Sequence, residues 1–122
     1  MIRGVGLDLV EVARMERAIS KEHFCARVFT EAERALLQKK RAPAESAAGF
    51  WAAKEAALKA LGTGIGPVRL TEVEVTKTES GQPVLTFSGK AKSAFEALGA
   101  RRAFVSITHS GGIAAAQVIL ED

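Results

Sequence analysis

The segment from Glu45 to Leu61 limits the fold of this chain more than any other part of the sequence. It is rich in alanine, the best helix former, and it runs into the glycine-studded stretch GTGIGP, which should stop a helix. Between residues 50 and 61 only Lys54, Glu55 and Lys59 are polar, and at about 100° per residue they span about 140° of the circumference. We therefore expect the longest helix here, buried on most sides, with these three side chains on one polar face.

Two capping-box patterns mark helix starts before this segment. A capping box joins a short polar N-cap residue to an acidic residue three positions later, and each pattern here introduces an apolar-periodic run. The first predicted helix follows an apolar strand over residues 2–8 and ends near residue 20. The second covers residues 31–42, after a short helix in between. The two pairs are Asp8 with Glu11 and Thr30 with Glu33.

After Pro67 the apolar residues alternate with polar ones, which is typical of strands. Residues 70–78 and 83–89 form a predicted hairpin across the turn ESGQP, and residues 102–120 form a second one across HSGG. A short helix separates the two hairpins. The order of strand, helices, strands, helix and strands predicts an α+β fold, with a mostly antiparallel sheet packed with the long central helix and shorter helices, in a single domain over residues 1–122.

The composition is that of a soluble globular protein, with 48% hydrophobic and 25% charged residues. No apolar run approaches the roughly 18 residues of a membrane span, and the N-terminal residues lack the apolar core of a signal peptide. Cys25 is the only cysteine, so an intramolecular disulfide or a cysteine-based zinc site is excluded. These observations predict a cytoplasmic protein without membrane contact.

The net charge of +3 is concentrated in the first third of the chain. Residues 1–42 contain nine Lys or Arg and six acidic residues, whereas the remainder contains eight of each. Such an excess either forms a solvated helical face or attracts an acidic partner: a protein, a nucleic acid or a phosphorylated small molecule. A nucleic-acid partner is not expected. The chain has no tyrosine, and Trp51 and most of the six Phe occur in apolar surroundings, so stacking platforms are scarce.

Two acidic residues and one histidine each have a structural and a functional interpretation. Glu55 and Lys59 are four residues apart and form an ordinary intrahelical pair, or else Glu55 binds a ligand. Asp8 is the N-cap of the first helix or a metal ligand at the end of a strand. Because Mg²⁺ takes only one or two protein carboxylates, Asp8 and Glu55 would suffice if the fold brings them together. His109 is a half-exposed turn residue or a contact for phosphate or ribose.

Several segments together resemble one family, the holo-acyl-carrier-protein synthases, which are small 4'-phosphopantetheinyl transferases. Two motifs carry most of the resemblance. The first is GVGLDLVEVARME, with Gly6, Asp8 and Arg14, and the second is WAAKEAALKALGTGIG, which is similar to the family's aromatic-A-A-K-E-A-x-x-K-A pattern. Further similar segments occur in the family's order, namely RVFTEAE, SGQP and VSITHSGGIAAAQV. The similarity spans almost the whole chain.

The resemblance implies transfer of 4'-phosphopantetheine from coenzyme A to a serine of apo-acyl carrier protein. This reaction releases adenosine 3',5'-bisphosphate and serves fatty acid biosynthesis. The implied catalytic residues are Asp8, Glu55 and Lys59. Asp8 and Glu55 would bind Mg²⁺, or Mn²⁺ in its place, and Lys59 would contact the phosphates and the departing oxygen. The resemblance leaves open whether Glu55 accepts the serine proton, either directly or through metal-bound water.

The resemblance also implies a homotrimer in which coenzyme A lies in a cleft between neighbouring subunits. The basic first third would hold the acidic recognition helix of the carrier protein. Many members have arginine where this chain has Phe50, so a phosphate contact there would have to come from Lys40 or Arg41. The implied coenzyme A contacts are Lys54, Lys59, Gly62, Thr63, Gly64, Gly81, Pro83, Thr108 and His109. The implied carrier-protein contacts are Arg14, Met15, Phe24 and Arg27.

Overall fold

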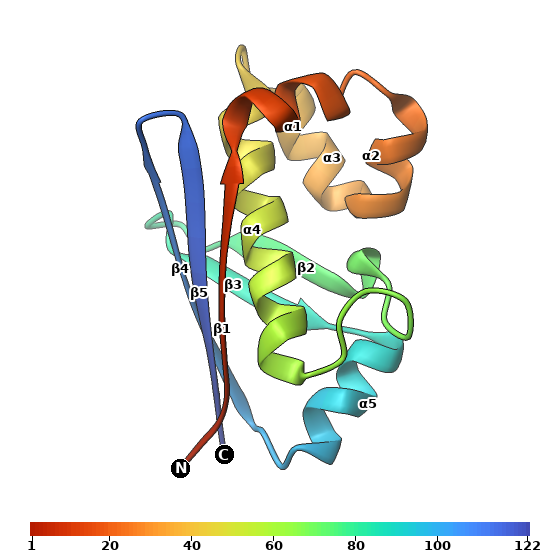
Figure 1. Cartoon of the computed structure of the whole chain (residues 1–122), viewed down its shortest axis with the longest axis vertical. Coiled ribbons are helices and arrows are strands. Elements are labelled where there is room, and N and C mark those ends of the chain that lie inside the picture. The colour runs from red at the N-terminus through yellow and green to blue at the C-terminus, as the bar shows by residue number, and fades with distance from the viewer.

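A three-stranded antiparallel sheet and a separate hairpin pack around one long helix in the structure, a computed structural model that describes residues 1–122. In chain order the elements are β1 (Ile2–Glu11), α1 (Val12–Ala18), α2 (Glu22–Val28), α3 (Glu31–Gln38), α4 (Pro43–Leu61), the 3-10 turn η1 (Leu70–Glu72), β2 (Val73–Lys77), β3 (Pro83–Phe87), α5 (Gly89–Ala97), β4 (Arg102–Ser110) and β5 (Ile113–Glu121). The larger sheet has the order β1-β5-β4, and β2 pairs with β3. Figure 1 shows α4 running alongside the larger sheet, with the hairpin crossing behind it and α1 to α3 gathered at one end. The predicted α+β fold with antiparallel sheets is confirmed.

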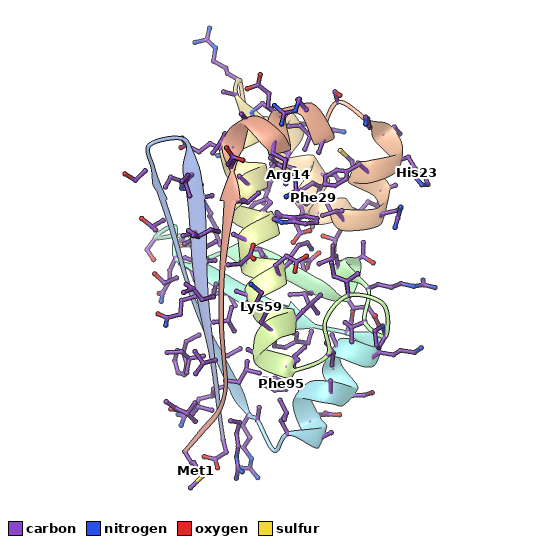
Figure 2. The ribbon with its side chains drawn as sticks, viewed as in Figure 1. Met1, Arg14, His23, Phe29, Lys59 and Phe95 are labelled. Atoms are coloured by element: carbon purple, nitrogen blue, oxygen red, sulfur yellow. The ribbon has the colours of Figure 1, made fainter.

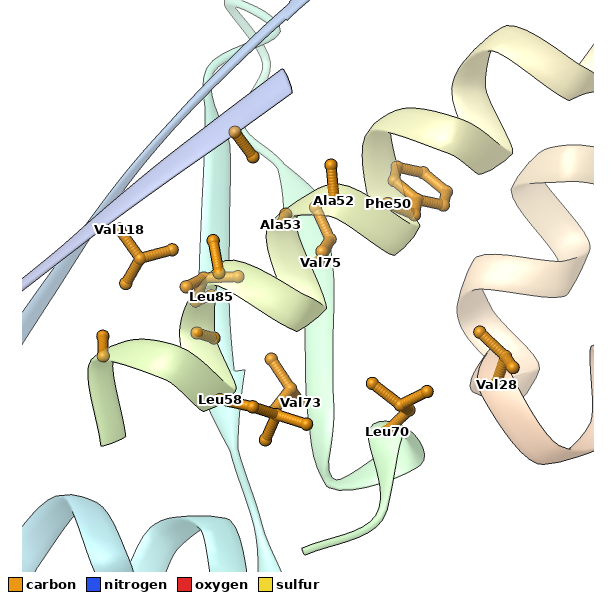
Figure 3. Packing of buried hydrophobic residues seen from close by; sticks show 14 of the residues in the cluster. Val28, Phe50, Ala52, Ala53, Leu58, Leu70, Val73, Val75, Leu85 and Val118 are labelled. Carbon is orange, nitrogen blue, oxygen red and sulfur yellow. The ribbon is translucent and has the colours of Figure 1, made fainter. Parts of the chain in front are cut away.

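α4 forms the centre of the core, as its alanine content predicts. It starts at Pro43, two residues before the predicted start, because the fixed φ of proline suits the first helical position. It ends where Gly62 takes a φ of +77°, in the left-handed region. Figure 3 shows Leu58 of α4 in one buried cluster with Val73 and Val75 of β2. α4 is the longest helix, but none of the helices combines the length and the apolar character needed to cross a bilayer.

The capping box predicted at the start of α3 is present. Oγ1 of Thr30 accepts the backbone N–H of Glu33 at 3.2 Å, and the carboxylate of Glu33 accepts the N–H of Thr30 at 2.9 Å. The helix ends at Gln38 rather than at residue 42, because exposed residues 39–42 turn the chain into α4. Both predicted hairpins are also confirmed, β2 with β3 and β4 with β5.

The capping box predicted at Asp8 is wrong, because β1 continues through Asp8 to Glu11. The backbone of Asp8 is paired with Ala116 of β5, and α1 starts only at Val12. Glu11 occupies the N-cap position, and its side chain makes no capping hydrogen bond. Pairing with a strand from the other end of the chain outweighs the local capping pattern. Asp8 is therefore a strand residue whose side chain is free for another role.

Two glycines let β1 pack closely on α4. A Cβ atom at Gly6 would collide with the carbonyl oxygen of Ala56, and one at Gly4 would collide with that of Ala60. Successive side chains of a strand point to opposite faces, so Asp8 shares the α4 side of β1 with both glycines. The close approach of strand and helix thus brings the carboxylate of Asp8 within reach of α4.

Candidate active site

A carboxylate with a free oxygen lies where β1 meets α4. Oδ1 of Asp8 accepts a hydrogen bond from Nζ of Lys59 at 3.1 Å, and the same ammonium donates to the carbonyl of Leu7 at 3.0 Å. Figure 2 shows Lys59 on the lower half of α4, beside β1. Oδ2 of Asp8 is buried and has no hydrogen-bond partner. Since a buried polar atom without a partner costs about 1–3 kcal/mol, this oxygen is a candidate ligand atom.

Glu55 lies one helical turn before Lys59 and is half-buried. The intrahelical pair expected between them is not formed, because the ammonium of Lys59 binds Asp8 instead. Burial raises the pKa of Glu55 by disfavouring its charged form, and the negative charge of Asp8 raises it further. The positive charge of Lys59 offsets part of this rise. The carboxylates of Asp8 and Glu55 are therefore close enough to repel each other.

Asp8 and Glu55 together fit a hard divalent cation. A cation would give Oδ2 of Asp8 a partner and would remove the repulsion between the two carboxylates. No group of three or more His, Cys, Asp or Glu side chains is placed to hold a metal, so the protein ligands would be this pair. Mg²⁺ suits such a pair, because it takes one or two carboxylates and leaves its other positions to water and substrate phosphate. The geometry thus favours Asp8 as a metal ligand.

The prediction that Lys54 shares a polar face with Glu55 and Lys59 is wrong. Lys54 is fully buried on the side of α4 that faces α3 and β2. Its Nζ donates to Oε1 of Glu33 at 2.6 Å and to the carbonyl of Val73. Because these partners occupy the ammonium inside the core, the structure contradicts a contact between Lys54 and coenzyme A. Burial lowers the pKa of Lys54, and the negative charge of Glu33 counteracts this.

The glycine-rich loop predicted to meet coenzyme A follows α4 directly. Gly62 and Gly64 have φ angles of +77° and +67°, and a Cβ atom at either would meet no neighbouring atom. The loop backbone is therefore open to an approaching ligand. Thr63 lies between the two glycines, and its Oγ1 is buried without a hydrogen-bond partner. The loop begins three residues after Lys59, so it adjoins the Lys59 end of the site.

The remaining predicted coenzyme A contacts lie away from Asp8 within one subunit. Nε2 of His109 is 2.8 Å from the carbonyl oxygen of Glu45, in the first turn of α4. Glu55 follows ten residues later, which is about 15 Å along the helix at about 1.5 Å per residue. The other contacts lie on β4, which β5 separates from β1, and at the turn of the hairpin that adjoins β4. They are Thr108, Gly81 and Pro83.

Phe50 gives no contact to phosphate, because it is 3% exposed and belongs to the core, as Figure 3 shows. Lys40 and Arg41, the expected substitutes for an arginine at that position, are exposed in the turn before α4. They lie at the same end of α4 as His109 and far from Glu55. Within one subunit neither residue reaches the pair of carboxylates.

Three of the four predicted carrier-protein contacts are accessible. Arg14 on α1 and Arg27 on α2 are exposed, and the half-buried Phe24 stacks on Trp51 with ring centroids 5.8 Å apart. Phe24, Arg27 and Trp51 line a cavity of about 730 Å³ between α2 and the loop after α4. The prediction for Met15 is wrong. It is 2% exposed, because α1 packs its Met15 side into the core.

The sequence interpretation gave Glu33 a role only in the capping box and missed its buried ion pair. Its carboxylate is fully buried and accepts from Lys54 and from the backbone N–H of Val75 at 2.7 Å. A signal was present in the sequence, since Glu33 precedes Leu36 and Leu37 by three and four residues. That spacing places Glu33 on the apolar face of α3.

Comparison with known proteins identifies the family of the chain. The chain matches the family model described as the 4'-phosphopantetheinyl transferase superfamily over residues 4–113, and it belongs to that superfamily. The holo-[acyl-carrier-protein] synthase of Solidesulfovibrio magneticus is 48% identical over 99% of both chains, and that of Koribacter versatilis is 43% identical over 100% of both. The crystal structure of a holo-(acyl-carrier-protein) synthase from Bacillus anthracis in complex with CoA (3',5'-ADP) is similar with a TM-score of 0.85 and 37% identity. That comparison covers 100% of this chain and 98% of the other. The resemblance seen in the sequence is confirmed.

Proposed function

We propose that this protein transfers the 4'-phosphopantetheine group of coenzyme A to a serine of apo-acyl carrier protein. The products are holo-acyl carrier protein and adenosine 3',5'-bisphosphate, and the reaction serves fatty acid biosynthesis. Full-length similarity to holo-[acyl-carrier-protein] synthases supports the proposal. The observation that carries it is the free, buried Oδ2 of Asp8 next to the half-buried carboxylate of Glu55. Transfer of a phosphoryl group from a diphosphate needs a cation at such a place.

Asp8 and Glu55 would hold Mg²⁺, with Mn²⁺ as a substitute. When bound, the ion offsets the negative charge on the phosphate oxygens during the transfer. Asp8 offers Oδ2 while Oδ1 remains hydrogen-bonded to Lys59, so the orientation of this carboxylate is set in advance. Glu55 contributes the second carboxylate from the middle of a rigid helix. Addition of EDTA is expected to abolish the transfer, and excess Mg²⁺ is expected to restore it.

Lys59 is the cation of the chain closest to the proposed chemistry. In the reaction the serine oxygen attacks the phosphorus that carries pantetheine and loses its proton, which Glu55 would accept directly or through a water. The bond from this phosphorus to the bridging oxygen breaks, and that oxygen leaves with adenosine 3',5'-bisphosphate. The side chain of Lys59 is 53% exposed, so its ammonium remains accessible to the diphosphate while it binds Asp8. We assign it the role of stabilising the departing oxygen.

A homotrimer is the second part of the proposal. The face of the β1-β5-β4 sheet that turns away from α4 carries several large apolar side chains in the open. Leu7 and Leu9 of β1 are 59% and 66% exposed, and Phe104 of β4 is 50% exposed. Exposed apolar side chains gathered on one sheet face support an interface with other copies of the chain. Sedimentation at micromolar concentration is expected to give the mass of a trimer, and a monomer would contradict this part.

Neighbouring subunits would then complete each other's coenzyme A site. Lys59 and the loop that starts at Gly62 lie near Asp8, whereas His109 lies against Glu45 and Gly49, about 9–15 Å before Glu55 along α4. The ground for a shared site is the family resemblance, which implies that coenzyme A lies in a cleft between neighbouring subunits. We propose that one subunit provides Lys59, Gly62, Thr63 and Gly64, and that its neighbour provides Gly81, Pro83, Thr108 and His109.

The carrier protein is proposed to dock on α1 and α2. Arg14 and Arg27 are exposed cations there, and Phe24 lines the cavity that it shares with Trp51. Trp51 and Glu55 are four residues apart on α4, so the cavity and the carboxylate lie on the same side of the helix. An acidic helix with one apolar side chain fits this surface. The exposed charges would mainly raise the association rate, which should fall with added salt.

A location in the cytoplasm is proposed from the properties of Cys25. Burial raises the pKa of its thiol, and the charge of Glu22 raises it further, so the thiol remains protonated. As the only cysteine it forms no disulfide within the chain. A chain with a single cysteine and no disulfide suits a reducing compartment. Fractionation of cells that express the tagged protein tests this location.

Mass spectrometry of the carrier protein tests the proposed reaction. The protein is mixed with coenzyme A, Mg²⁺ and an apo-acyl carrier protein, and a carrier with its serine changed to alanine is the control. The carrier is expected to gain one phosphopantetheine group while adenosine 3',5'-bisphosphate appears in equal amount. A carrier of unchanged mass would contradict the proposal. Tight binding of coenzyme A without turnover would identify a coenzyme A-binding protein instead.

A further inference from the structure

Two fully buried ionic side chains that the proposed reaction does not use lie beside the candidate site. Glu33 and Lys54 are each 0% exposed, and their charged groups are joined at 2.6 Å. Lys54 immediately precedes Glu55, so the two side chains leave α4 about 100° apart. A buried ion pair is a weak source of stability compared with apolar residues of the same shape. A role that apolar residues could not fill would explain why this pair is ionic.

The ion pair closes the free edge of the small hairpin. The N–H of Val75 donates to Oε2 of Glu33 at 2.7 Å, and the carbonyl of Val73 accepts from Nζ of Lys54. β2 has β3 on one side only, so these backbone groups lie on the edge that lacks a partner strand. Oε1 of Glu33 also accepts the N–H of Thr30 at the start of α3. One ion pair thus ties α4 to both β2 and α3.

The surface of α4 has few large side chains that could fix its rotation against the larger sheet. Its buried residues are mostly alanine, and Gly4 and Gly6 of β1 face them. Ridges of large side chains normally set how a helix sits on its neighbour, and small residues give a smoother surface. A rotation of about 20° would move an atom about 6 Å from the helix axis by about 2 Å. Metal–ligand distances tolerate only about 0.2 Å, so such a rotation would disrupt a metal site.

We propose that Glu33 and Lys54 are positioning residues, whose ion pair sets the rotation of α4 and so holds Glu55 opposite Asp8 at the metal site. The inference rests on the proposed function, because a positioning role requires a cation at Asp8 and Glu55. Neither positioning residue contacts the substrate, the cation or the reacting atoms. Their effect reaches the reaction through the placement of Glu55.

A double variant, Glu33→Gln with Lys54→Met, removes the ion pair without leaving a buried charge. The oxygen of the new amide can still accept the N–H of Val75, but its NH2 group then replaces the oxygen that accepts the N–H of Thr30, so the edge of β2 stays paired while the cap of α3 is weakened. The new thioether fills the space of the lysine but cannot bind the amide strongly, so the link from α3 to α4 is lost. Leu58→Ala is the matched control. Leu58 is fully buried one turn farther along the same side of α4, and its truncation loosens the packing without touching the ion pair.

Binding of Mn²⁺ in the presence of coenzyme A, followed by electron paramagnetic resonance, is the main readout. We expect the double variant to bind Mn²⁺ about 10- to 100-fold more weakly and to lose a similar factor in kcat. The KM for the carrier protein should not change, because α1 and the exposed face of α2 are untouched. Leu58→Ala should keep its Mn²⁺ affinity at temperatures where it is folded. Unchanged affinity in the double variant, or an equal loss in both variants, would overturn the inference.

Measurements on the unsubstituted protein distinguish a failure of the proposed function from a failure of the inference about Glu33 and Lys54. If it neither binds Mn²⁺ nor transfers the group, the proposed function is overturned and the inference with it. If it is active while the double variant keeps its Mn²⁺ affinity, only the inference is overturned. Should circular dichroism show an unfolded double variant, Lys54→Gln replaces it. This change shortens the link but keeps a donor, and the same results support or overturn the inference.

Discussion

α4 presents charged groups to two surroundings that differ in how completely those groups are paired. Towards α3 and β2, both oxygens of Glu33 and the ammonium of Lys54 have partners. Towards β1, Asp8 keeps one buried oxygen without a partner, and Glu55 has a raised pKa because of burial and the nearby charge of Asp8. Fully paired buried charges hold a structure together, whereas a buried carboxylate oxygen without a partner indicates a ligand site. Removal of a charge should therefore destabilise the fold on the side facing α3 and β2. On the side facing β1, removal of the Glu55 charge should leave the stability unchanged or raise it, and reduce the activity.

The largest expected effect on stability is that of Lys54→Met. The change leaves the carboxylate of Glu33 buried without its cation, which typically costs about 3–5 kcal/mol. Urea unfolding followed by circular dichroism measures the loss. The control is Lys59→Met on the same helix, and it should cost less, because the pair of Lys59 and Asp8 is partly exposed, with side-chain exposures of 53% and 14%, whereas that of Lys54 and Glu33 is fully buried. Equal losses from the two changes would show that the two sides of α4 do not differ.

Glu55→Gln, unlike Lys54→Met, should reduce the activity without reducing the stability of the fold. Transfer activity is expected to fall more than about 100-fold, since even changes behind metal ligands cost about 10- to 100-fold. The thermal midpoint should stay the same or rise, because the substitution removes a half-buried charge that Asp8 repels. Initial rates of carrier modification and thermal unfolding monitor the two properties. A lower thermal midpoint together with retained activity would contradict the assignment of the β1 side of α4 as the active site.

Gly6→Ala tests whether the close approach of β1 to α4 matters for both stability and site geometry. The added methyl group meets the carbonyl oxygen of Ala56, so the strand must move away from the helix. We expect a loss of about 1–3 kcal/mol and weaker Mn²⁺ binding. Gly4→Ala is the control, since it collides with Ala60 but lies farther from Asp8, and it should affect stability more than Mn²⁺ affinity. Unchanged Mn²⁺ affinity in the Gly6 variant would exclude a link between this approach and the site.

The smallest expected effect is on the acid side of the stability profile. Backbone hydrogen bonds from Arg69 and Lys90 lower the pKa of Glu72, and bonds from the N-terminus and Arg3 lower that of Asp122. A lowered folded pKa gives stability that is present above the ordinary value and is lost as the pH falls through the lowered one. Stability should thus decline below about pH 4.5. Glu72→Gln should make this decline shallower in pH-dependent urea unfolding, and an unchanged slope would contradict the assignment.

The sequence predicts those helices and strands that are determined by interactions between residues close together in the chain. The alanine content of α4, the capping box at Thr30 and the alternation in the hairpins each act between neighbours in the chain. The continuation of the strand past Asp8 to Glu11 could not be predicted in this way, because the pairing of β1 with β5 joins the two ends of the sequence. The local capping pattern at Asp8 and Glu11 was therefore misleading.

The burial of individual side chains was harder to predict than the helices that carry them. Lys54 and Met15 were expected to meet ligands, yet both point into the core. The direction of a helical side chain relative to the core depends on which elements pack around the helix, and no local pattern states that. Asp8, Glu55 and Lys59 were found through their motifs, but their spatial proximity emerges only from the fold.

The central claim is that Asp8 and Glu55 bind the same cation, and a crystal structure with coenzyme A and Mn²⁺ tests it most directly. Anomalous scattering from manganese locates the ion independently of the protein. We predict one peak at coordination distance from Oδ2 of Asp8 and from a carboxylate oxygen of Glu55, adjacent to the diphosphate. A peak that touches only one of these carboxylates, or no peak beside the bound diphosphate, would contradict the account.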